Sequence, residues 1–564
     1  MEKYCVILIN FLFLCIAQAN TFYVRPDSGN YGLGNGYDWG NAFAGMPPGR
    51  ADTNGTVWTS EYPHSSDLIG PGDTVYVSGG VYRTNWEPAA SGTAERNIVI
   101  LRATDINHGT DEGWSTDFDN QVVLDQVHIN IWGPLGKPDQ GWDYITIDGA
   151  VKSGIKIFGP LGADNPAINL SPGNQHESDY ITLRYLEVEG PGINLELPND
   201  SVCSSGIHEY SPGNRGAYGL VIQHCKVHNY SGALIHLSAV RDFLVENCEL
   251  HDAGNNQDFN DCHVDLLITN YANGTFRYNK CYNSEAAGIA IAYTPATGPY
   301  EVYGNYFHNV ENAVEIQGQD NELHVFNNTF DKCNHAISVT RDRTTGFGYN
   351  NLFYRCYATY LGTPPAFTHD YSWSSKSWFA PQGEYHSVIY PTSRPYPEVD
   401  EGPDPFINAD EMDYHLNPAI DDSISPIDKG KSDIGSQYNL DLDGVERIGT
   451  WDIGAYEYDG STGITTEKPI PDQFSLSQNF PNPFNPITNI EYQISNAEFV
   501  TLKIFDVLGR EVVTLVKKTM PAGIHTAQWN GKNTAGQRVG SGIYFYRLKT
   551  ANGFMRIKKM IMMK

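Results

Sequence analysis

The densest group of metal-ligand side chains in the sequence lies in one short stretch, Asn255–Asp265. Asp261, His263 and Asp265 alternate along it, so in an extended strand these three side chains point to the same side. Carboxylates joined by an imidazole hold Ca²⁺ or another divalent cation. A cation beside a uronate sugar lowers the cost of removing the proton next to the carboxylate. The stretch therefore predicts a metal site, with Ca²⁺ as the expected cofactor, for chemistry on an anionic sugar.

The same residues also have a purely structural interpretation. Asp and Asn cap turns through short hydrogen bonds to the backbone, and histidines at a corner of a fold can simply be solvated. The sequence by itself leaves both interpretations open.

Two kinds of glycan cleavage are compatible with the neighbouring residues. Elimination needs a base for the proton beside the carboxylate and a group that neutralises the carboxylate. His251 or His308 is the candidate base, and Arg341 is the candidate neutraliser. Hydrolysis needs instead two carboxyl groups, ~5 Å apart if the reaction retains configuration and ~6.5–9.5 Å apart if it inverts it. The candidate pairs for hydrolysis are Asp265 with Glu285, and Glu285 with Glu315.

A repeat from Gly219 to Tyr360 predicts the scaffold that must position these residues. Its strand-sized segments alternate apolar and polar residues, are rich in β-formers and return at a fixed step, which is typical of a parallel β-helix. Two sets of like residues recur every 23 positions: Asn305, Asn328 and Asn351, then Phe307, Phe330 and Phe353. We expect each set to stack from coil to coil.

One coil is longer than the others. Equivalent residues are normally 23 positions apart, whereas Lys280, the expected equivalent of Cys248 on the next coil, follows it by 32. About nine residues are therefore inserted, and they fall in the stretch that carries the candidate metal ligands. Solenoids usually place insertions on their binding face. The same alignment places Asn283 between His251 and His308 on successive coils.

Composition and charge narrow the classes of partner. The chain has 564 residues and a formal net charge of −29, which argues against nucleic acid because phosphate binding needs a basic surface. Lys3 precedes an apolar run from Val6 to Ala17, and the residues up to Ala19 have the small-x-small form of a signal-peptidase site. We therefore expect export, cleavage after Ala19, and no transmembrane segment in the mature chain.

The cysteines of the mature chain are expected to be structural. Cys225 with Cys248, and Cys333 with Cys356, occupy common inward columns, where a free thiol serves as a small apolar side chain. A disulfide across a turn is the alternative.

Three parts of the chain resemble known exported proteins. The stretch LIGPGDTVYVSGGVYRTNW resembles the entry segment of secreted right-handed β-helix proteins, which include polysaccharide lyases and glycoside hydrolases. The stretches DYHLNPAIDDSISPIDKG and NLDLDGVERIGTWDIGAYEY resemble the segment that closes many such β-helices. The stretches SLSQNFPNPFNP, FDVLGREV and WNGKNTAGQRVGSGIYFYRL resemble the C-terminal sorting domain of proteins exported by the type IX secretion system.

The patterns and the resemblances together predict an all-β chain with six parts. These are a signal peptide (1–19), an N-terminal cap with the first coil (20–97), a right-handed parallel β-helix (98–400), its C-terminal cap (401–459), a linker (460–473) and a small immunoglobulin-like β-sandwich (474–564). By resemblance, the last part is a type IX sorting domain, so the secretion machinery is an expected partner. We expect the protein to be secreted or anchored at the cell surface.

The expected function is action on an extracellular polysaccharide. Cation-assisted β-elimination of a polymer that can contain uronate is the first hypothesis, and a glycoside hydrolase on the same scaffold is its nearer alternative. A non-catalytic adhesion or binding protein is the alternative from another class. An enzyme should bring imidazole and carboxylate groups together in one groove, whereas in a non-catalytic protein these groups should be scattered.

Overall fold

A computed structural model gives the structure of the chain. It describes residues 19–47, 58, 68–131, 142–160, 166–170, 178–192, 205–209, 217–254, 264–292, 298–318, 320–339, 343–362, 364, 366–375, 386–389, 404–435, 438–458, 475–476, 488–494, 498–506, 510–520, 523–529, 531–534, 538–540, 542–550 and 555–562. The expected linker and nearly all of the expected signal peptide lie outside these residues.

The contacts divide the chain into two units. The first comprises Met1–Leu244, Ala253–Val264 and Thr269–Asn273, and the second comprises Val245–Asp252, Asp265–Ile268 and Gly274–Lys564. Three strands have residues in both units: β17 (Phe243–Glu246), β18 (Glu249–Ala253) and β19 (Leu267–Asn270). Among the described residues, helix is limited to the short 3-10 turns η1 (Thr116–Phe118) and η2 (Ala409–Glu411), and no helix is long and apolar enough to cross a membrane.

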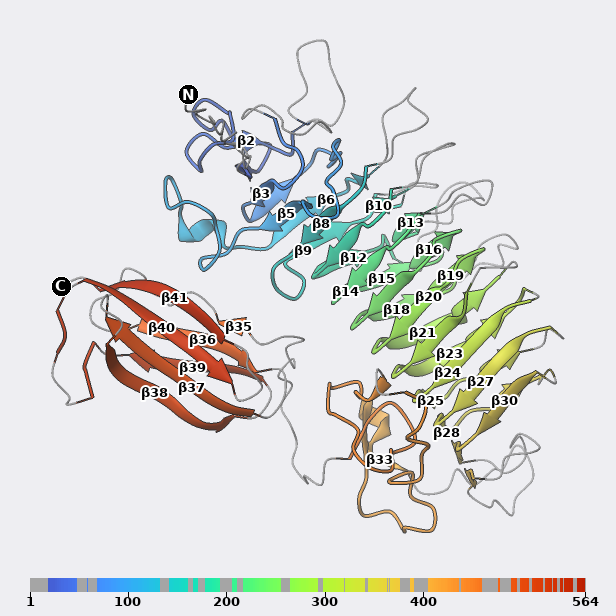
Figure 1. Cartoon of the computed structure of the whole chain (residues 1–564). Coiled ribbons are helices and arrows are strands. Elements are labelled where there is room, and N and C mark those ends of the chain that lie inside the picture. The colour runs from blue at the N-terminus through green and yellow to red at the C-terminus, as the bar shows by residue number, and fades with distance from the viewer. Residues whose placement is uncertain are drawn as a thin grey trace, which may run out of the picture. The chain divides into compact units, whose positions relative to one another are not determined.

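The strands of the first unit stack as parallel coils (Figure 1). One face contains β2 (Phe43–Ala44), β1 (Thr21–Arg25), β3 (Thr74–Val77), β5 (Ile98–Arg102), β8 (Ile145–Asp148), β11 (Thr182–Arg184) and β14 (Val221–Gln223). A second row contains β4 (Gly80–Tyr82), β6 (Val122–Asp125), β9 (Ile155–Phe158), β12 (Leu186–Glu189) and β15 (Lys226–Tyr230). A third row contains β7 (Ile129–Asn130), β10 (Ile168–Asn169), β13 (Ile207–Glu209) and β16 (Ile235–Ser238).

The second unit continues the same plan in its own coils. One face contains β20 (Gly274–Arg277), β22 (Tyr300–Tyr303), β24 (Glu322–Phe326), β27 (Thr345–Tyr349) and β30 (Phe367–Asp370). The long strands β21 (Lys280–Ile291) and β23 (Tyr306–Ile316) pair along their whole length. Beyond β23 the coils divide into a row of β25 (Thr329–Asp331), β28 (Leu352–Tyr354), β31 (Trp373–Ser374) and β32 (Val388–Ile389), and a row of β26 (His335–Val339) and β29 (Ala358–Leu361).

The expected stacks of like residues are confirmed. The side-chain amide of Asn305 donates to Oδ1 of Asn328 at 3.0 Å, and that of Asn328 donates to Oδ1 of Asn351 at 3.1 Å, all fully buried. The rings of Phe307, Phe330 and Phe353 stack with centroids 5.2 and 5.3 Å apart. The described cysteines are buried free thiols, as expected for apolar filler: Cys225, Cys248, Cys281, Cys333 and Cys356.

The register expected for the long coil is wrong by one residue. The N–H of Cys248 donates to Oδ1 of Asn279, which heads the asparagine ladder through its own bond to Asn305, so the step is 31 residues and ends at Asn279, not Lys280. Consequently Tyr282, and not Asn283, is the register partner of His308.

Each coil of the second unit turns at a residue in the left-handed region. Asp252, Asn283, Asn309, Lys332 and Arg355 have φ between 52° and 57°. Asn and Asp tolerate this conformation best, and here their side chains also pair: Asn283 donates to Asp252 at 3.0 Å and Asn309 donates to Asn283 at 2.9 Å. The residues just before these corners form one in-register column: Tyr282, His308, Asp331 and Tyr354.

The segment 404–458 packs on the coils of the second unit. It carries β33 (Phe406–Asn408) and β34 (Asp413–Leu416), and its Tyr414, Ile453 and Tyr456 join a common buried cluster with Leu352 and Trp373. A buried ion pair between Arg447 and Glu457 at 2.9 Å holds its own turns together.

The C-terminal strands form two antiparallel sheets around a separate core. One contains β35 (Ser475–Leu476), β36 (Thr488–Ile494) and β39 (Gly523–Trp529); the other contains β38 (Glu511–Met520), β37 (Glu498–Asp506), β40 (Gly542–Thr550) and β41 (Met555–Met562). Their buried residues, among them Ile490, Leu502, Trp529 and Tyr546, form a single cluster. This is the expected small β-sandwich.

Candidate functional site

The candidate site is centred on His308, in the column of β21, β23 and β25. We call it the His308 site and define it by His308, Asp331, Tyr414, Tyr282 and Lys332. Nδ1 of His308 lies 2.9 Å from Oδ2 of Asp331 and 2.7 Å from the hydroxyl of Tyr414, which itself donates to Asp331 at 3.0 Å. The Asp331 side chain is completely buried, whereas the imidazole keeps 15% of its exposure.

The partners of Asp331 fix the tautomer of His308. Burial acts to raise the pKa of Asp331, but hydrogen bonds from His308 and Arg355 prevail and lower it, so the carboxylate is ionised at neutral pH. An ionised carboxylate only accepts hydrogen bonds, so Nδ1 of His308 must carry the proton. The lone pair of neutral His308 is then on Nε2, which makes no hydrogen bond to any other described residue. This is the arrangement of an oriented general base.

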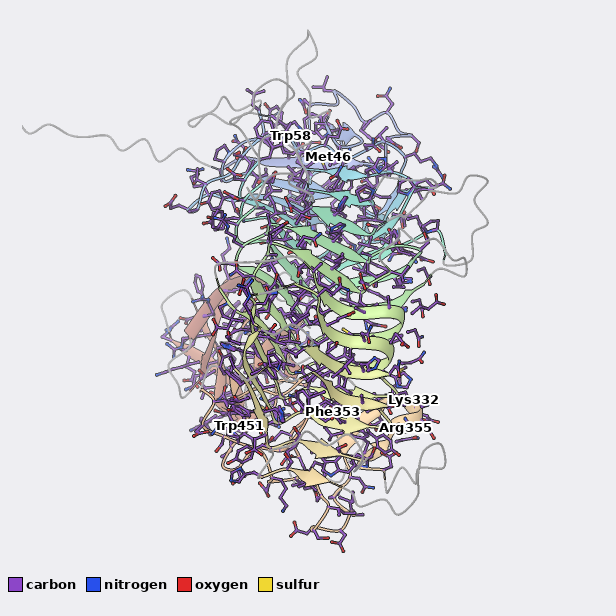
Figure 2. The ribbon with its side chains drawn as sticks, turned by 90° about the vertical axis from the view of Figure 1, so that its right-hand side faces the viewer. Met46, Trp58, Lys332, Phe353, Arg355 and Trp451 are labelled. Carbon is purple, nitrogen blue, oxygen red and sulfur yellow. The ribbon has the colours of Figure 1, made fainter. Side chains whose placement is uncertain are left out.

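Arg355 anchors the site from the next corner. Its Nε donates to Asp331 at 2.7 Å, and its Nη1 pairs with Asp410 at 2.5 Å. Lys332, which directly follows Asp331, lies 3.8 Å from the same Asp410 carboxylate and keeps 45% of its side-chain exposure. Figure 2 labels Lys332 and Arg355 close together at one edge of the second unit. Arg355 is therefore committed to neutralising Asp331, while Lys332 is the exposed cation beside the site.

Tyr282 lies on the coil before His308 and brings a second proton-carrying group. Its hydroxyl donates to Glu249 at 2.7 Å, and its ring stacks on His251 with centroids 4.5 Å apart. Burial and the hydrogen bond to Glu249 both raise the pKa of Tyr282, so its proton is retained at neutral pH. His251 itself is buried, with Nδ1 2.8 Å from Asp252.

The structure brings together only some of the residues singled out in the sequence. His251 and His308 lie in one column with Tyr282 between them, as stated above. Asp265 is buried and accepts the backbone N–H of Ala287 at 2.9 Å. Glu315 lies beside Ala290 in register and accepts from Asn312 at 3.3 Å, so it does not face Glu285. Asp261, His263 and Arg341 lie outside the described residues.

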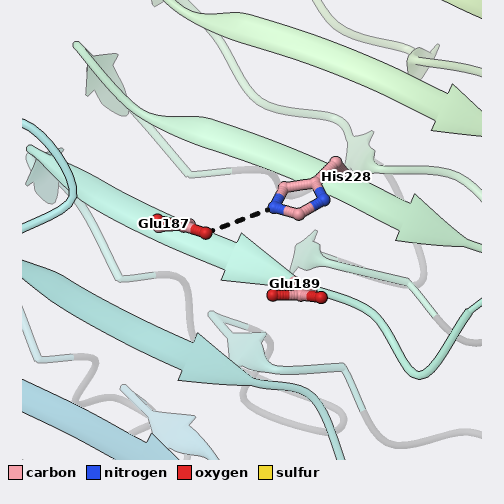
Figure 3. Close-up of side chains that lie close together, drawn as sticks. All are labelled: Glu187, Glu189 and His228. Carbon is pink, nitrogen blue, oxygen red and sulfur yellow. Dashed lines mark ion pairs between the residues drawn. The ribbon is translucent and has the colours of Figure 1, made fainter.

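A second polar cluster, on β9, β12 and β15 of the first unit, was not predicted as a site. Glu187, Glu189 and His228 place ligand atoms within 4.8 Å of one another, and Nε2 of His228 lies 3.5 Å from Glu187 (Figure 3). The ammonium of Lys156 bridges the two carboxylates at 2.8 and 2.7 Å. The alternation of acids in Leu186–Glu189 was visible in the sequence, but the lysine comes from another coil.

This cluster does not fit a resident Ca²⁺. Ca²⁺ takes six to eight oxygen ligands, as a rule, whereas the cluster offers two carboxylates and an imidazole. Lys156 already supplies the positive charge: partial burial acts to raise the pKa of Glu187, but the hydrogen bond from Lys156 prevails and lowers it. We therefore derive no step through a metal at this cluster.

Comparisons with known proteins agree with this architecture. The family model described as "Right handed beta helix region" matches residues 179–356, and the model described as "FlgD Ig-like domain" matches residues 487–553. No curated protein matches the chain in sequence.

Three solved structures are similar to parts of this chain. A mannuronic acid specific polysaccharide family 6 lyase from human gut microbiota is 12% identical over 59% of this chain and 64% of its own, with a TM-score of 0.34. The GH136 lacto-N-biosidase of Eubacterium ramulus is 11% identical over 62% and 66%, with a TM-score of 0.31. PorZ, a surface component of the type IX secretion system of Porphyromonas gingivalis, is 19% identical over 16% and 12%, with a TM-score of 0.13.

Each of these matches spans less than two thirds of the solved chain, and likenesses this low carry no conclusion about activity. The architecture itself does not depend on them. The chain combines a right-handed parallel β-helix with a C-terminal immunoglobulin-like β domain.

Proposed function

We propose that this protein is an exported polysaccharide lyase that cleaves a uronate-containing polymer by β-elimination at the His308 site. The observation that carries the proposal is the His308–Asp331 pair, in which a buried, ionised carboxylate holds the proton on Nδ1 and leaves Nε2 as the base. A general base oriented in this way typically contributes about 10²- to 10⁴-fold to the rate.

The remaining residues of the site match the other requirements of elimination. Nε2 of His308 takes the proton from the carbon next to the uronate carboxylate, the bond to the leaving sugar oxygen breaks, and a carbon–carbon double bond forms. Tyr282, in register with His308 on the adjacent coil, supplies its proton to the leaving oxygen by giving up its hydrogen bond to Glu249. Lys332 pairs with the uronate carboxylate. A local cation is needed because the chain as a whole, with a net charge of −29, repels an anionic polymer.

Elimination is favoured over hydrolysis by the placement of carboxylates. Of the pairs expected for hydrolysis, Glu285 and Glu315 do not face each other, since Glu315 lies beside Ala290, and Asp265 is buried and accepts the backbone N–H of Ala287. Glu187 and Glu189, whose carboxylate oxygens lie within 4.8 Å of each other, are bridged by Lys156, which keeps Glu187 ionised and unsuited to donate a proton.

An activity screen tests the proposal directly. The secreted protein is incubated with alginate, pectate, chondroitin and neutral glycans, and the ultraviolet absorbance of the unsaturated product is followed. We expect absorbance to rise with at least one uronate polymer. The rate of this rise should be at least about 10²-fold lower for a His308→Gln variant.

His335→Gln is the matched control, because His335 is a histidine of the same unit whose Nδ1 contacts the amide of Asn312 and no carboxylate. It should keep full activity. New reducing ends without absorbance would indicate a hydrolase, and binding without any product would indicate a non-catalytic protein. Either result would reject the lyase.

We also propose that 474–564 is the type IX sorting domain and that Asp261, His263 and Asp265 bind Ca²⁺. The sorting proposal is supported by the sequence motifs quoted above and by the immunoglobulin-like fold of the segment. Export measured with and without the segment tests the first point. The Asp261→Asn/Asp265→Asn variant, with thermal stability measured at varied calcium, tests the second.

A further inference from the structure

A column of polar side chains runs along the third row of strands in the first unit. Its members are Glu87, Asn130, Asn169, His208 and His236, and we call it the polar column. Strand pairing sets Asn169 beside Asn130, His208 beside Asn169 and His236 beside His208, while the bridge between Trp86 and Ile129 sets Glu87 beside Asn130. Neighbouring strands lie ~4.8 Å apart, so the column presents one polar group per coil over five coils.

The column points away from the core. Its members alternate with fully buried residues on the same strands, such as Ile129, Ile168, Ile207 and Ile235. A strand directs successive side chains to opposite faces, so the polar members face outward. They are nevertheless half-buried, and Asn130 keeps only 7% of its exposure. An outward polar row that is partly enclosed differs from an ordinary solvated face.

Neighbouring members are already aligned by contacts with one another. The amide of Asn130 donates to Glu87 at 3.5 Å. The rings of His208 and His236 stack with centroids 4.8 Å apart, and Nε2 of His236 lies 3.1 Å from the amide of Asn270. The side chains are thus held in fixed orientations before any ligand arrives, which lowers the entropy cost of binding.

The chemistry of the column suits hydroxyl groups and not charges. Asn130 and Asn169 each offer both a donor and an acceptor, and so does a neutral imidazole. Burial lowers the pKa of His208 to about 4, so this ring is neutral at pH 7. Glu87 is the one acidic member of the column, and a carboxylate repels an anion. A sugar hydroxyl both donates and accepts, and so complements this set.

The connections between strands grow longer beside the column. Among the described residues, the next strand after Asn130 begins at Ile145, after Asn169 at Thr182, and after Glu209 at Val221. By contrast, β16 ends at Ser238 and β17 begins at Phe243. Three successive connections that follow the third row of strands are therefore longer in sequence than the connection that follows β16. In solenoids, insertions repeated on one side usually mark the binding face.

We propose that the polar column binds a neutral glycan chain that lies along the stack of coils, with its hydroxyls hydrogen bonded to Asn130, Asn169, His208 and His236. A linear polymer with repeated hydroxyls can engage one polar side chain per coil, which a compact ligand cannot do. The site is in the first unit and its proposal does not depend on the elimination proposed for the His308 site.

Isothermal titration calorimetry of the full chain with hexasaccharides of β-1,4-linked glucose, xylose or mannose tests the proposal, with an alginate hexasaccharide as the anionic comparison. Neutral hexasaccharides lack the carboxylate that elimination needs, so cleavage does not interfere. We expect at least one of them to bind the wild-type chain, and the Asn169→Ala/His236→Ala variant to bind it at least tenfold more weakly.

Two further variants make the test specific. His236→Gln keeps a donor and an acceptor at the same position and should retain most of the affinity. Asn334→Ala/His335→Ala removes the same residue types from a coil of the second unit and should retain all of it. The proposal is overturned if the wild-type chain binds none of the neutral hexasaccharides, if it binds only the alginate hexasaccharide, or if the variant in the polar column binds as well as the wild type. Unchanged thermal unfolding of the variants confirms that a loss of affinity does not come from misfolding.

Discussion

Nδ1 of His308 lies 2.9 Å from the carboxylate of Asp331, and this carboxylate is completely buried. The pair spans adjacent coils, since the two residues are 23 positions apart. Tyr414 and Arg355 complete the environment of the carboxylate, with bonds of 3.0 and 2.7 Å. The orientation of the imidazole is therefore a property of the folded second unit and not of a local sequence motif.

Asp331→Asn should abolish the basic character of His308 while nearly preserving shape. The new amide can donate to Nδ1, which would move the histidine proton to Nε2. We expect lyase activity to fall by about 10²-fold or more. Removing the partner of Arg355 should also lower the free energy of unfolding by about 3–5 kcal/mol. Asp410→Asn is the control, because that carboxylate is exposed; it should change both quantities little. Activity in Asp331→Asn equal to wild type would exclude His308 as the base.

His415 should make the stability of the segment 404–458 depend on pH between about 6.5 and about 9. Its Nε2 lies 2.7 Å from Asp443 and its Nδ1 2.6 Å from Asp413. The hydrogen bond to Asp443 is the main cause that raises the pKa of His415 from 6.5 to about 9, against the effect of burial. His415 therefore contributes its full stabilisation to the folded state below pH 6.5. This contribution is lost as the pH rises to about 9.

Thermal unfolding of wild type and His415→Gln from pH 6 to pH 10 checks this expectation. The midpoint of the wild type should fall relative to that of the variant as pH passes from about 6.5 to about 9. A difference between the two midpoints that is constant over this range would contradict the role of His415.

Asn328 should be among the most sensitive core positions. Its amide donates to the carbonyls of Val302 and Phe326, and its Oδ1 accepts the backbone N–H of Asn305 at 3.0 Å. Asn328→Ala leaves these buried groups without partners, each at about 1–3 kcal/mol. We expect a loss of at least about 3 kcal/mol in chemical denaturation. Asn334→Ala, which removes one bond to Glu311 near the surface, should cost less than about 1 kcal/mol.

Deletion of 474–564 should abolish export without lowering the stability of the solenoid. The C-terminal sheets have their own buried cluster, so their loss leaves the solenoid core intact. We expect the midpoint of solenoid unfolding to stay the same and the protein to be retained inside the outer membrane. Aggregation of the shortened chain on refolding would show that the segment is needed for folding and not only for export.

The sequence by itself determined the solenoid and its stacks. A fixed step of 23 residues places like side chains one above the other, so the asparagine ladder and the phenylalanine stack were predictable from Asn305, Asn328 and Phe330 alone. The alternation of apolar and polar residues fixed which side chains face inward. Asp331 obeys the same rule, since it follows His308 by 23 residues and pairs with it in register.

Only the tertiary structure decided the contents of the His308 site. Because of the insert, the register of one coil cannot be read from the repeat. The residue equivalent to Cys248 is Asn279 and not Lys280, so Tyr282 instead of Asn283 lies beside His308. Tyr414 reaches His308 from 106 residues further along the chain. Such contacts depend on how the segment 404–458 packs on the coils. This segment does not repeat, so no periodicity in the sequence predicts its packing.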